Sequence, residues 1–192
     1  LSNILTLHQM EFHDFHSQLS LEIMNRKMTL RDFPLPKSVQ SEIVGVVSGG
    51  FDPVHPGHIA MFKEAAEMTD YLIVGVNSDA WLTRKKGKPF MPLSDRLEVI
   101  YNFGMVDNVA WWDDSDGSAC ELLEGLKEHC AFDSILFCNG GDRGLSDCPE
   151  TAVENITCVF GIGGDYKMSS SSDYIKEWEE LMSPFRKEHY YS

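Results

Sequence analysis

Residues 49–58 read GGFDPVHPGH, and this stretch decides the fold class. It follows an apolar run at residues 43–47, typical of a buried strand, and precedes residues 58–69, which are typical of an amphipathic helix. Two histidines three residues apart therefore lie at a strand-to-helix turn. Such turns bind phosphate groups in parallel α/β sheets, because the helix N-terminus offers unpaired N–H groups and partial positive charge. The glycines let the backbone approach a ligand closely.

Strand and helix signals alternate from this stretch to the end of the chain. Further apolar runs predict four more strands, at residues 71–76, 108–112, 134–138 and 157–161. Helical patterns lie between and after them, at residues 94–103 with Ser94 as N-cap, 118–129, 150–155 and 170–181. This alternation predicts a Rossmann-like, doubly wound, parallel five-stranded sheet with helices on both faces.

The first 40 residues differ from the rest and are predicted to form a helical N-terminal extension, followed by one α/β domain over residues 41–192. Residues 33–36 read FPLP, which breaks the helical pattern and suggests a linker. His13 and His16 have a spacing that metal ligands use, but no cysteine or acidic cluster completes a site. We expect the extension to pack as a helix on the domain or on a second subunit.

Composition limits the class of function. The net charge of −14 argues against a general nucleic-acid binder, although residues 84–88, RKKGK, form a local basic patch. The five cysteines are odd in number and form no C-x-x-C pair, so we expect reduced thiols in a cytoplasmic protein. No apolar run approaches the ~20 residues that span a bilayer, and no signal peptide is evident, so we expect no membrane insertion.

The order of residues in GFDPVHPGH, from Gly50 to His58, resembles the HxGH signature of the nucleotidyltransferase superfamily and its cytidylyltransferase-like family. Residues 77–96 resemble the matching segment of glycerol-3-phosphate cytidylyltransferases, and still more that of the adenylyltransferase domain acting on heptose 1-phosphate. The resemblance implies transfer of a nucleotidyl group from a nucleoside triphosphate to a phosphorylated small molecule, with release of pyrophosphate. It also implies Mg²⁺ bound with the triphosphate, and a homodimer.

The two histidines of this signature suit the chemistry of nucleotidyl transfer. The reaction increases negative charge on the oxygens of the α-phosphate, while the attacking phosphate is already ionised and needs no strong base. Imidazole N–H groups beside a helix N-terminus supply positioning and charge stabilisation. The resemblance implies that His55 and His58 bind the triphosphate and stabilise the transition state. The competing interpretation is a pair of ordinary turn histidines.

Two cations complete the predicted catalytic set. In the families that this chain resembles, a lysine in the loop after the second strand and an arginine of the next helix contact phosphates. By position these roles fall to Lys86, with Lys85 or Lys88 as competitors, and to Arg96. Arginine suits bidentate phosphate binding, whereas lysine acts as a mobile point charge. A solvated, lysine-rich loop over residues 81–90 is the alternative.

Three further segments are predicted to contact the nucleotide: residues 77–79, residues 140–142 and residues 167–172. No residue is predicted to form a dedicated metal site. The resemblance places a Gly-Gly-Asp turn and a serine-rich helix start near the nucleotide, although plain turn formation and N-capping explain both as well. Asp52 either assists Mg²⁺ indirectly or shapes its turn. The predicted nucleotide-binding residues are Gly49, Gly50, Phe51, Asp52, Gly57, Asn77, Asp79, Gly140, Gly141, Asp142, Lys167, Ser170, Ser171 and Ser172.

Overall resemblance favours CTP as donor and glycerol 3-phosphate or a sugar phosphate as acceptor. The alternative is an adenylyltransferase that uses ATP on a heptose 1-phosphate-like acceptor. Cytidylyltransferases usually carry an Arg-Thr pair where residues 165–166 read Asp-Tyr, so Lys167 would have to replace the arginine. An alternative of another class is a nucleotide-binding sensor without turnover, against which the intact His55, His58 and Arg96 argue.

Overall fold

The computed structural model of the chain describes residues 43–129, 134–141, 143–164 and 170–188, with side chains up to residue 182 in the last helix. The predicted N-terminal extension lies outside these ranges. It stays a prediction, as does the homodimer. Within the described ranges, each helix is too short or too polar to cross a lipid bilayer.

The sheet has five strands, all parallel, as the sequence predicts. Its spatial order is β3-β2-β1-β4-β5. In the central register Val46 of β1 lies between Ile73 of β2 and Phe137 of β4. The strands are β1 (Ile43–Gly49), β2 (Tyr71–Val76), β3 (Asn108–Ala110), β4 (Ser134–Gly140) and β5 (Ile156–Ile162).

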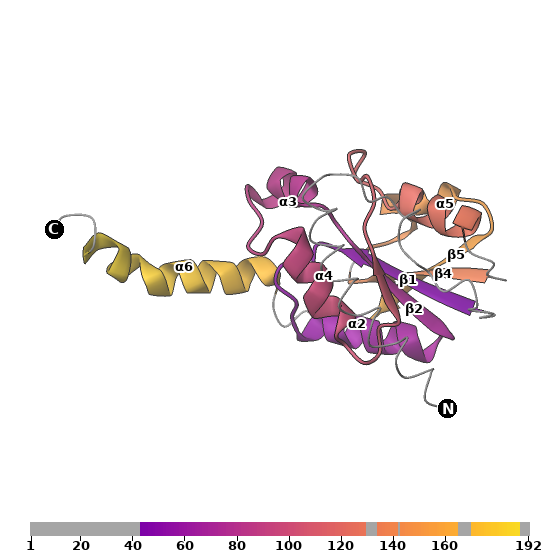
Figure 1. Cartoon of the computed structure of the whole chain (residues 1–192), viewed down its shortest axis with the longest axis horizontal. Helices are drawn as coiled ribbons and strands as arrows, with labels where there is room; N and C mark the ends of the chain where they lie inside the picture. Colours follow the sequence, from indigo (N-terminus) through magenta and orange to yellow (C-terminus); the bar gives the residue numbers. More distant parts are fainter. Residues whose placement is uncertain (1–42, 130–133, 142, 165–169, 189–192) are drawn as a thin grey trace, which may run out of the picture.

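Helices cover both faces of the sheet, which confirms the doubly wound prediction (Figure 1). On one face α2 (Pro56–Glu67) and α4 (Leu93–Tyr101) bury Phe62 and Leu97 against the sheet. On the other face α5 (Cys120–His129) buries Leu122, Leu123 and Leu126. Strand side chains alternate between the two layers, as the period of two requires. The remaining elements are α3 (Asp79–Lys86), η2 (Leu145–Asp147), η3 (Pro149–Ala152) and α6 (Ser171–Glu188), which extends away from the domain.

Three local predictions were wrong. Residues 81–90 were expected to form a loop, but most of them lie in α3, because Ser78 caps this helix by accepting a hydrogen bond from Trp81 N at 3.0 Å. Ser94 does not cap α4. That helix begins one residue earlier after Pro92, and the Ser94 hydroxyl donates to Asp95 instead. The short α-helix expected at residues 150–155 is replaced by the 3₁₀ turn η3, which ends at Ala152.

The strand order places a topological switch point between β1 and β4. From β1 the chain adds β2 and β3 on one side, then crosses back and adds β4 and β5 on the other. The loops after β1 and β4 therefore leave in opposite directions. Such topological switch points are where open α/β sheets bind their ligands. The GGFDPVHPGH stretch lies at this point, since it connects β1 to α2.

A substitution at Gly75 in β2 tests how tightly the sheet packs against α5. A Cβ added there would lie 2.4 Å from Leu122 Cδ2 and 3.0 Å from the Trp112 ring. We expect Gly75→Ala to lower the free energy of unfolding by about 1–3 kcal/mol through overpacking, measured by urea denaturation. Gly104→Ala is the control, because a Cβ at that position meets nothing within 4 Å. Equal stability of the two variants would contradict this account of the α5 interface.

Candidate functional site

The two histidines of the signature face each other at the start of α2. His55 is the N-cap in extended conformation, and its backbone N–H donates to His58 Nδ1 at 3.3 Å. The imidazole ring centroids lie 3.6 Å apart with an interplanar angle of 25°. The edge of the Phe51 ring also packs on His58, with centroids 5.0 Å apart. The turn thus holds both imidazoles side by side at the N-terminus of α2.

The residues before the histidines shape this turn. Phe51 adopts a φ of 48°, which is unusual for a residue other than glycine, and its side chain is buried. A Cβ on Gly49 would lie 2.9 Å from the Phe51 ring, and one on Gly50 would lie 2.8 Å from Leu82. Both glycines therefore make room for neighbouring side chains in the chain itself. Gly57 lies in the first turn of α2.

Burial keeps the histidine pair neutral. It lowers the pKa of His58 to about 3, with smaller contributions from the nearby His55 and Lys86 charges. Burial, followed by the charge of Lys86, also lowers the pKa of His55. Because Nδ1 of His58 accepts a hydrogen bond, the proton of its neutral imidazole lies on Nε2. The pair therefore offers N–H dipoles rather than formal positive charge near neutral pH.

Among the three candidate lysines, Lys86 is the one that approaches the histidines. Its Nζ donates to the backbone oxygen of Asp52 at 3.2 Å, and burial lowers its pKa. Lys85 instead places its ammonium over the Trp81 ring, 4.4 Å from the centroid. Lys88 is exposed in the following loop. The site thus combines two neutral imidazoles with one half-buried cation.

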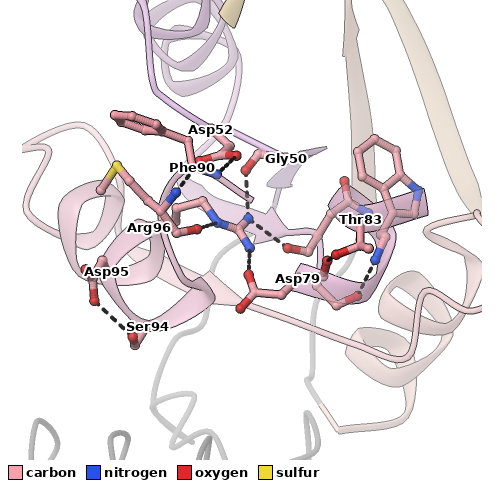
Figure 2. A network of polar contacts seen from close by, with 12 residues as sticks. Gly50, Asp52, Asp79, Thr83, Phe90, Ser94, Asp95 and Arg96 are labelled. Atoms are coloured by element: carbon pink, nitrogen blue, oxygen red, sulfur yellow. Dashed lines mark hydrogen bonds and ion pairs between the residues drawn. The ribbon is translucent and has the colours of Figure 1, made fainter. Parts of the chain in front are cut away.

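Arg96 is fully buried, and Figure 2 shows the polar contacts that surround its guanidinium. Its Nε donates to Met91 O at 3.0 Å, and Nη1 donates to Gly50 O at 2.7 Å and Asn77 O at 2.8 Å. Its Nη2 forms an ion pair with Asp79 Oδ1 at 2.6 Å. The resemblance implies that this arginine contacts phosphate, yet the structure commits its donors to four segments of the chain.

Asp52 is also fully buried, and its carboxylate binds the chain (Figure 2). Oδ2 accepts from Phe90 N at 2.7 Å, and Oδ1 accepts from Met91 N at 2.8 Å. Of the two roles considered for Asp52, this geometry matches shaping of the turn, because the carboxylate fixes the loop that follows α3. Across the described residues, no three histidine, cysteine or acidic side chains gather as a metal cage requires.

The residues predicted after β2 make contacts within the protein. Asn77 is buried, and its Nδ2 donates to Asp114 Oδ2 at 3.0 Å. Asp79 is half exposed and pairs with Arg96. Both side chains thus help to fix the junction between β2 and α3.

The glycine turn after β4 lies beside α2. A Cβ on Gly140 would lie 2.7 Å from Met61 Sδ and 3.1 Å from Ile162 O, so the close packing here requires glycine. Gly141 has a φ of 68° and open space around its Cα, which suits the close approach of a ligand to the backbone. The predicted partners Asp142 and Lys167 lie outside the described residues.

The serine-rich segment brings the start of α6 to the histidine turn. Ser171 Oγ donates to Pro53 O at 2.9 Å, and the Tyr174 ring lies 6.4 Å from that of His55. Ser170 acts as a cap, because its hydroxyl donates to Asp173 Oδ2 and accepts from Asp173 N. Ser172 is half buried in the first turn. The start of α6 therefore contacts the turn that precedes α2.

Sequence reasoning missed three buried or anchoring carboxylates. Glu64 of α2 accepts from Gly163 N at 2.7 Å and so fixes the turn after β5. Glu150 is buried and pairs with Arg143 at 2.7 Å. Asp114 is 2 % exposed and binds the β2–α3 junction. The partners of Glu64 and Asp114 lie far away in the sequence, and Arg143 is seven residues from Glu150 in the same β4–β5 connection, so no regular sequence period indicates these contacts.

Comparison with known proteins gives a family for the chain. The family model described as Cytidylyltransferase-like matches residues 46–186. A bifunctional protein HldE from Marinomonas sp. is 38 % identical over 153 residues, which cover 79 % of this chain and 29 % of that protein. The HldE of Hahella chejuensis is 38 % identical over 128 residues, 66 % of this chain and 24 % of that protein.

A lipopolysaccharide core biosynthesis protein from Thermoplasma volcanium is 24 % identical, with a TM-score of 0.47, covering 62 % of this chain and 94 % of that one. The chain spans less than a third of the curated relatives described above.

A five-stranded parallel sheet with a strand-to-helix turn at its switch point is the architecture in which open α/β proteins bind ligands. The chain belongs to the cytidylyltransferase-like family of the nucleotidyltransferase superfamily.

The neutral state of His58 predicts a pH dependence of stability. The unfolded chain protonates His58 near its ordinary pKa of about 6.5, whereas the folded chain resists protonation until about 3. The unfolded state therefore binds more protons in this window, so the free energy of unfolding decreases as pH falls from 6.5 toward 3. We expect His58→Gln to flatten this decrease between about pH 7.5 and 5, measured by urea denaturation. An unchanged slope would show that His58 titrates normally in the folded protein.

Proposed function

We propose that this chain transfers a nucleoside monophosphate from a nucleoside triphosphate to a phosphorylated small molecule. The observation that carries the proposal is the pair of facing imidazoles, 3.6 Å apart, with Lys86 beside them at the N-terminus of α2. Neutral N–H donors, a nearby ammonium and a helix N-terminus form a site for a polyanion whose charge increases during reaction. The family match supports the same reaction class.

The proposed step is an in-line displacement at the α-phosphorus. An oxygen of the acceptor phosphate forms the new P–O bond, and the bond to the bridging oxygen breaks, so that pyrophosphate leaves with the electron pair. His58 Nε2–H and the His55 ring donate to the phosphate oxygens that gain charge. Lys86 compensates charge on the triphosphate as a point charge. The start of α6 offers the Ser172 hydroxyl and backbone N–H groups for the outer phosphates, since the Ser170 and Ser171 hydroxyls already donate within the chain.

Arg96 and Asp52 enter the proposal as positioning residues. Their donors and acceptors hold the backbone at the end of β1 and the loop after α3. Mg²⁺ would arrive with the triphosphate and be held mainly by phosphate oxygens, where it neutralises part of their charge. Asp52 fits poorly as a ligand, because both carboxylate oxygens already accept backbone N–H groups.

The donor and acceptor are proposed as ATP and a heptose 1-phosphate-like sugar phosphate. The curated relatives are HldE proteins, and the adenylyltransferase domain of that kind of protein acts on heptose 1-phosphate. This supports the adenylyl alternative better than the cytidylyl transfer that overall resemblance favours. The Asp-Tyr sequence at residues 165–166, in place of the Arg-Thr pair of cytidylyltransferases, is consistent with that choice.

Pyrophosphate release tests the proposal. The full chain is assayed with ATP and CTP against heptose 1-phosphate, glycerol 3-phosphate and other sugar phosphates. We expect highest turnover with ATP and a sugar 1-phosphate, and a loss of about 10²-fold or more in kcat for His58→Ala, as removal of a transition-state donor produces. Lys63→Ala, at an exposed position of the same helix, is the matched control and should retain full activity.

Two results would contradict the proposal. Tight nucleotide binding without pyrophosphate release for any donor and acceptor pair would favour a non-catalytic sensor. Near-normal turnover of folded His58→Ala would remove the imidazole pair from the mechanism. A clear preference for CTP would leave the reaction class intact and reverse the choice of donor.

A further inference from the structure

One buried residue, Asp114, contacts helix α3 near both ends, with its carboxylate at the start of the helix and its backbone oxygen near the end. At the start of the helix, Asp114 Oδ2 accepts from Ser78 N at 2.7 Å and Oδ1 accepts from Ser78 Oγ at 2.6 Å. Near its end, Arg84 Nη2 donates to Asp114 O at 2.7 Å and lies 3.7 Å from Oδ1. Asp114 itself comes from the loop after β3, so the ties cross from one βα connection to the next.

The Asp114 carboxylate is fixed in place because its burial demands partners. It is 2 % exposed, and a buried carboxylate without hydrogen bonds is very costly. Asn77 Nδ2 supplies a third donor to the two from Ser78. Ser78 in turn accepts from Trp81 N, so the capping hydroxyl links the carboxylate directly to the first turn of α3.

Helix α3 depends on such ties for its orientation. It has eight residues, too few for a helix to be stable by its own hydrogen bonds. Buried Leu82, the Asp79–Arg96 ion pair and the Lys86–Asp52 hydrogen bond attach it to the domain together with the contacts to Asp114. The last residue of the helix is Lys86, whose ammonium lies near the histidine pair.

We propose that Asp114 is a positioning residue for nucleotidyl transfer, acting through α3 to place the Lys86 ammonium over the histidine turn. The inference rests on the proposed function, since it gives Lys86 its role at the triphosphate. Asp114 does not contact the substrates itself, because both carboxylate oxygens are occupied by chain donors in a buried place. Its removal changes catalysis by letting the basic end of α3 move.

A double-mutant cycle separates this role from a purely structural one. Asp114→Asn and Lys86→Met are made singly and together in the full chain, and kcat and KM for the triphosphate are measured. We expect each single variant to lower kcat/KM by about tenfold or more, and the double variant to be little worse than Lys86→Met alone. This non-additivity arises because a displaced Lys86 and a missing Lys86 are the same defect.

Asp107→Asn is the matched control. Asp107 lies in the loop before β3 and accepts from Leu72 N at 2.8 Å, at the opposite end of β2 from the site. Its loss removes a comparable hydrogen bond without touching α3. We expect this variant to lose stability, to keep kcat and KM near wild-type values, and to combine additively with Lys86→Met.

A milder variant covers the case in which Asp114→Asn fails to fold. Ser78→Ala removes the hydroxyl that links Asp114 to the cap of α3, and it should show the same non-additivity with Lys86→Met. Additive losses for both variants, or wild-type kinetics for Lys86→Met, would overturn the inference while wild-type activity persists. An inactive wild-type chain across all substrate pairs would instead refute the proposed function.

Discussion

The architecture of the site depends on one buried cation. Arg96 has no exposed surface, and burial of a guanidinium is affordable only when its donors are matched by acceptors. Those acceptors come from the end of β1, the end of β2, the start of α3 and the loop before α4. The carboxyl ends of β1 and β2 are thereby held in one arrangement. Breaking the set would leave carbonyl oxygens buried without donors.

Because Arg96 is committed to the scaffold, the charge available to a ligand comes from elsewhere. The described residues provide Lys86 and two imidazoles that burial keeps neutral, all beside the N-terminus of α2. In the proposed function, this local arrangement binds a polyanion despite the net charge of −14. Two further carboxylates, Asp52 and Asp114, fix the loop and the helix on which Lys86 lies.

The apolar pattern of the sequence was sufficient to predict the five strands of the sheet, because buried parallel strands are continuous apolar runs bounded by turns. The strand at 71–76 was predicted to the residue, and the position of the histidines at a strand-to-helix turn followed from order alone. Helix α3 was missed because its residues are polar and its stability comes from Asp114, 36 residues beyond Ser78. The sequence also shows that Arg96 and Asp52 are polar, but only the structure shows that they face the chain. Asp142 and Lys167 lie outside the described residues.

A crystal structure with a non-hydrolysable nucleoside triphosphate is the most direct test of this division between scaffold and site. The account predicts phosphate oxygens within hydrogen-bonding distance of His58 Nε2 and Lys86 Nζ, while Arg96 still donates to Gly50, Asn77 and Met91. A phosphate held by Arg96 after release of those carbonyls, or a triphosphate bound away from both imidazoles, would contradict it.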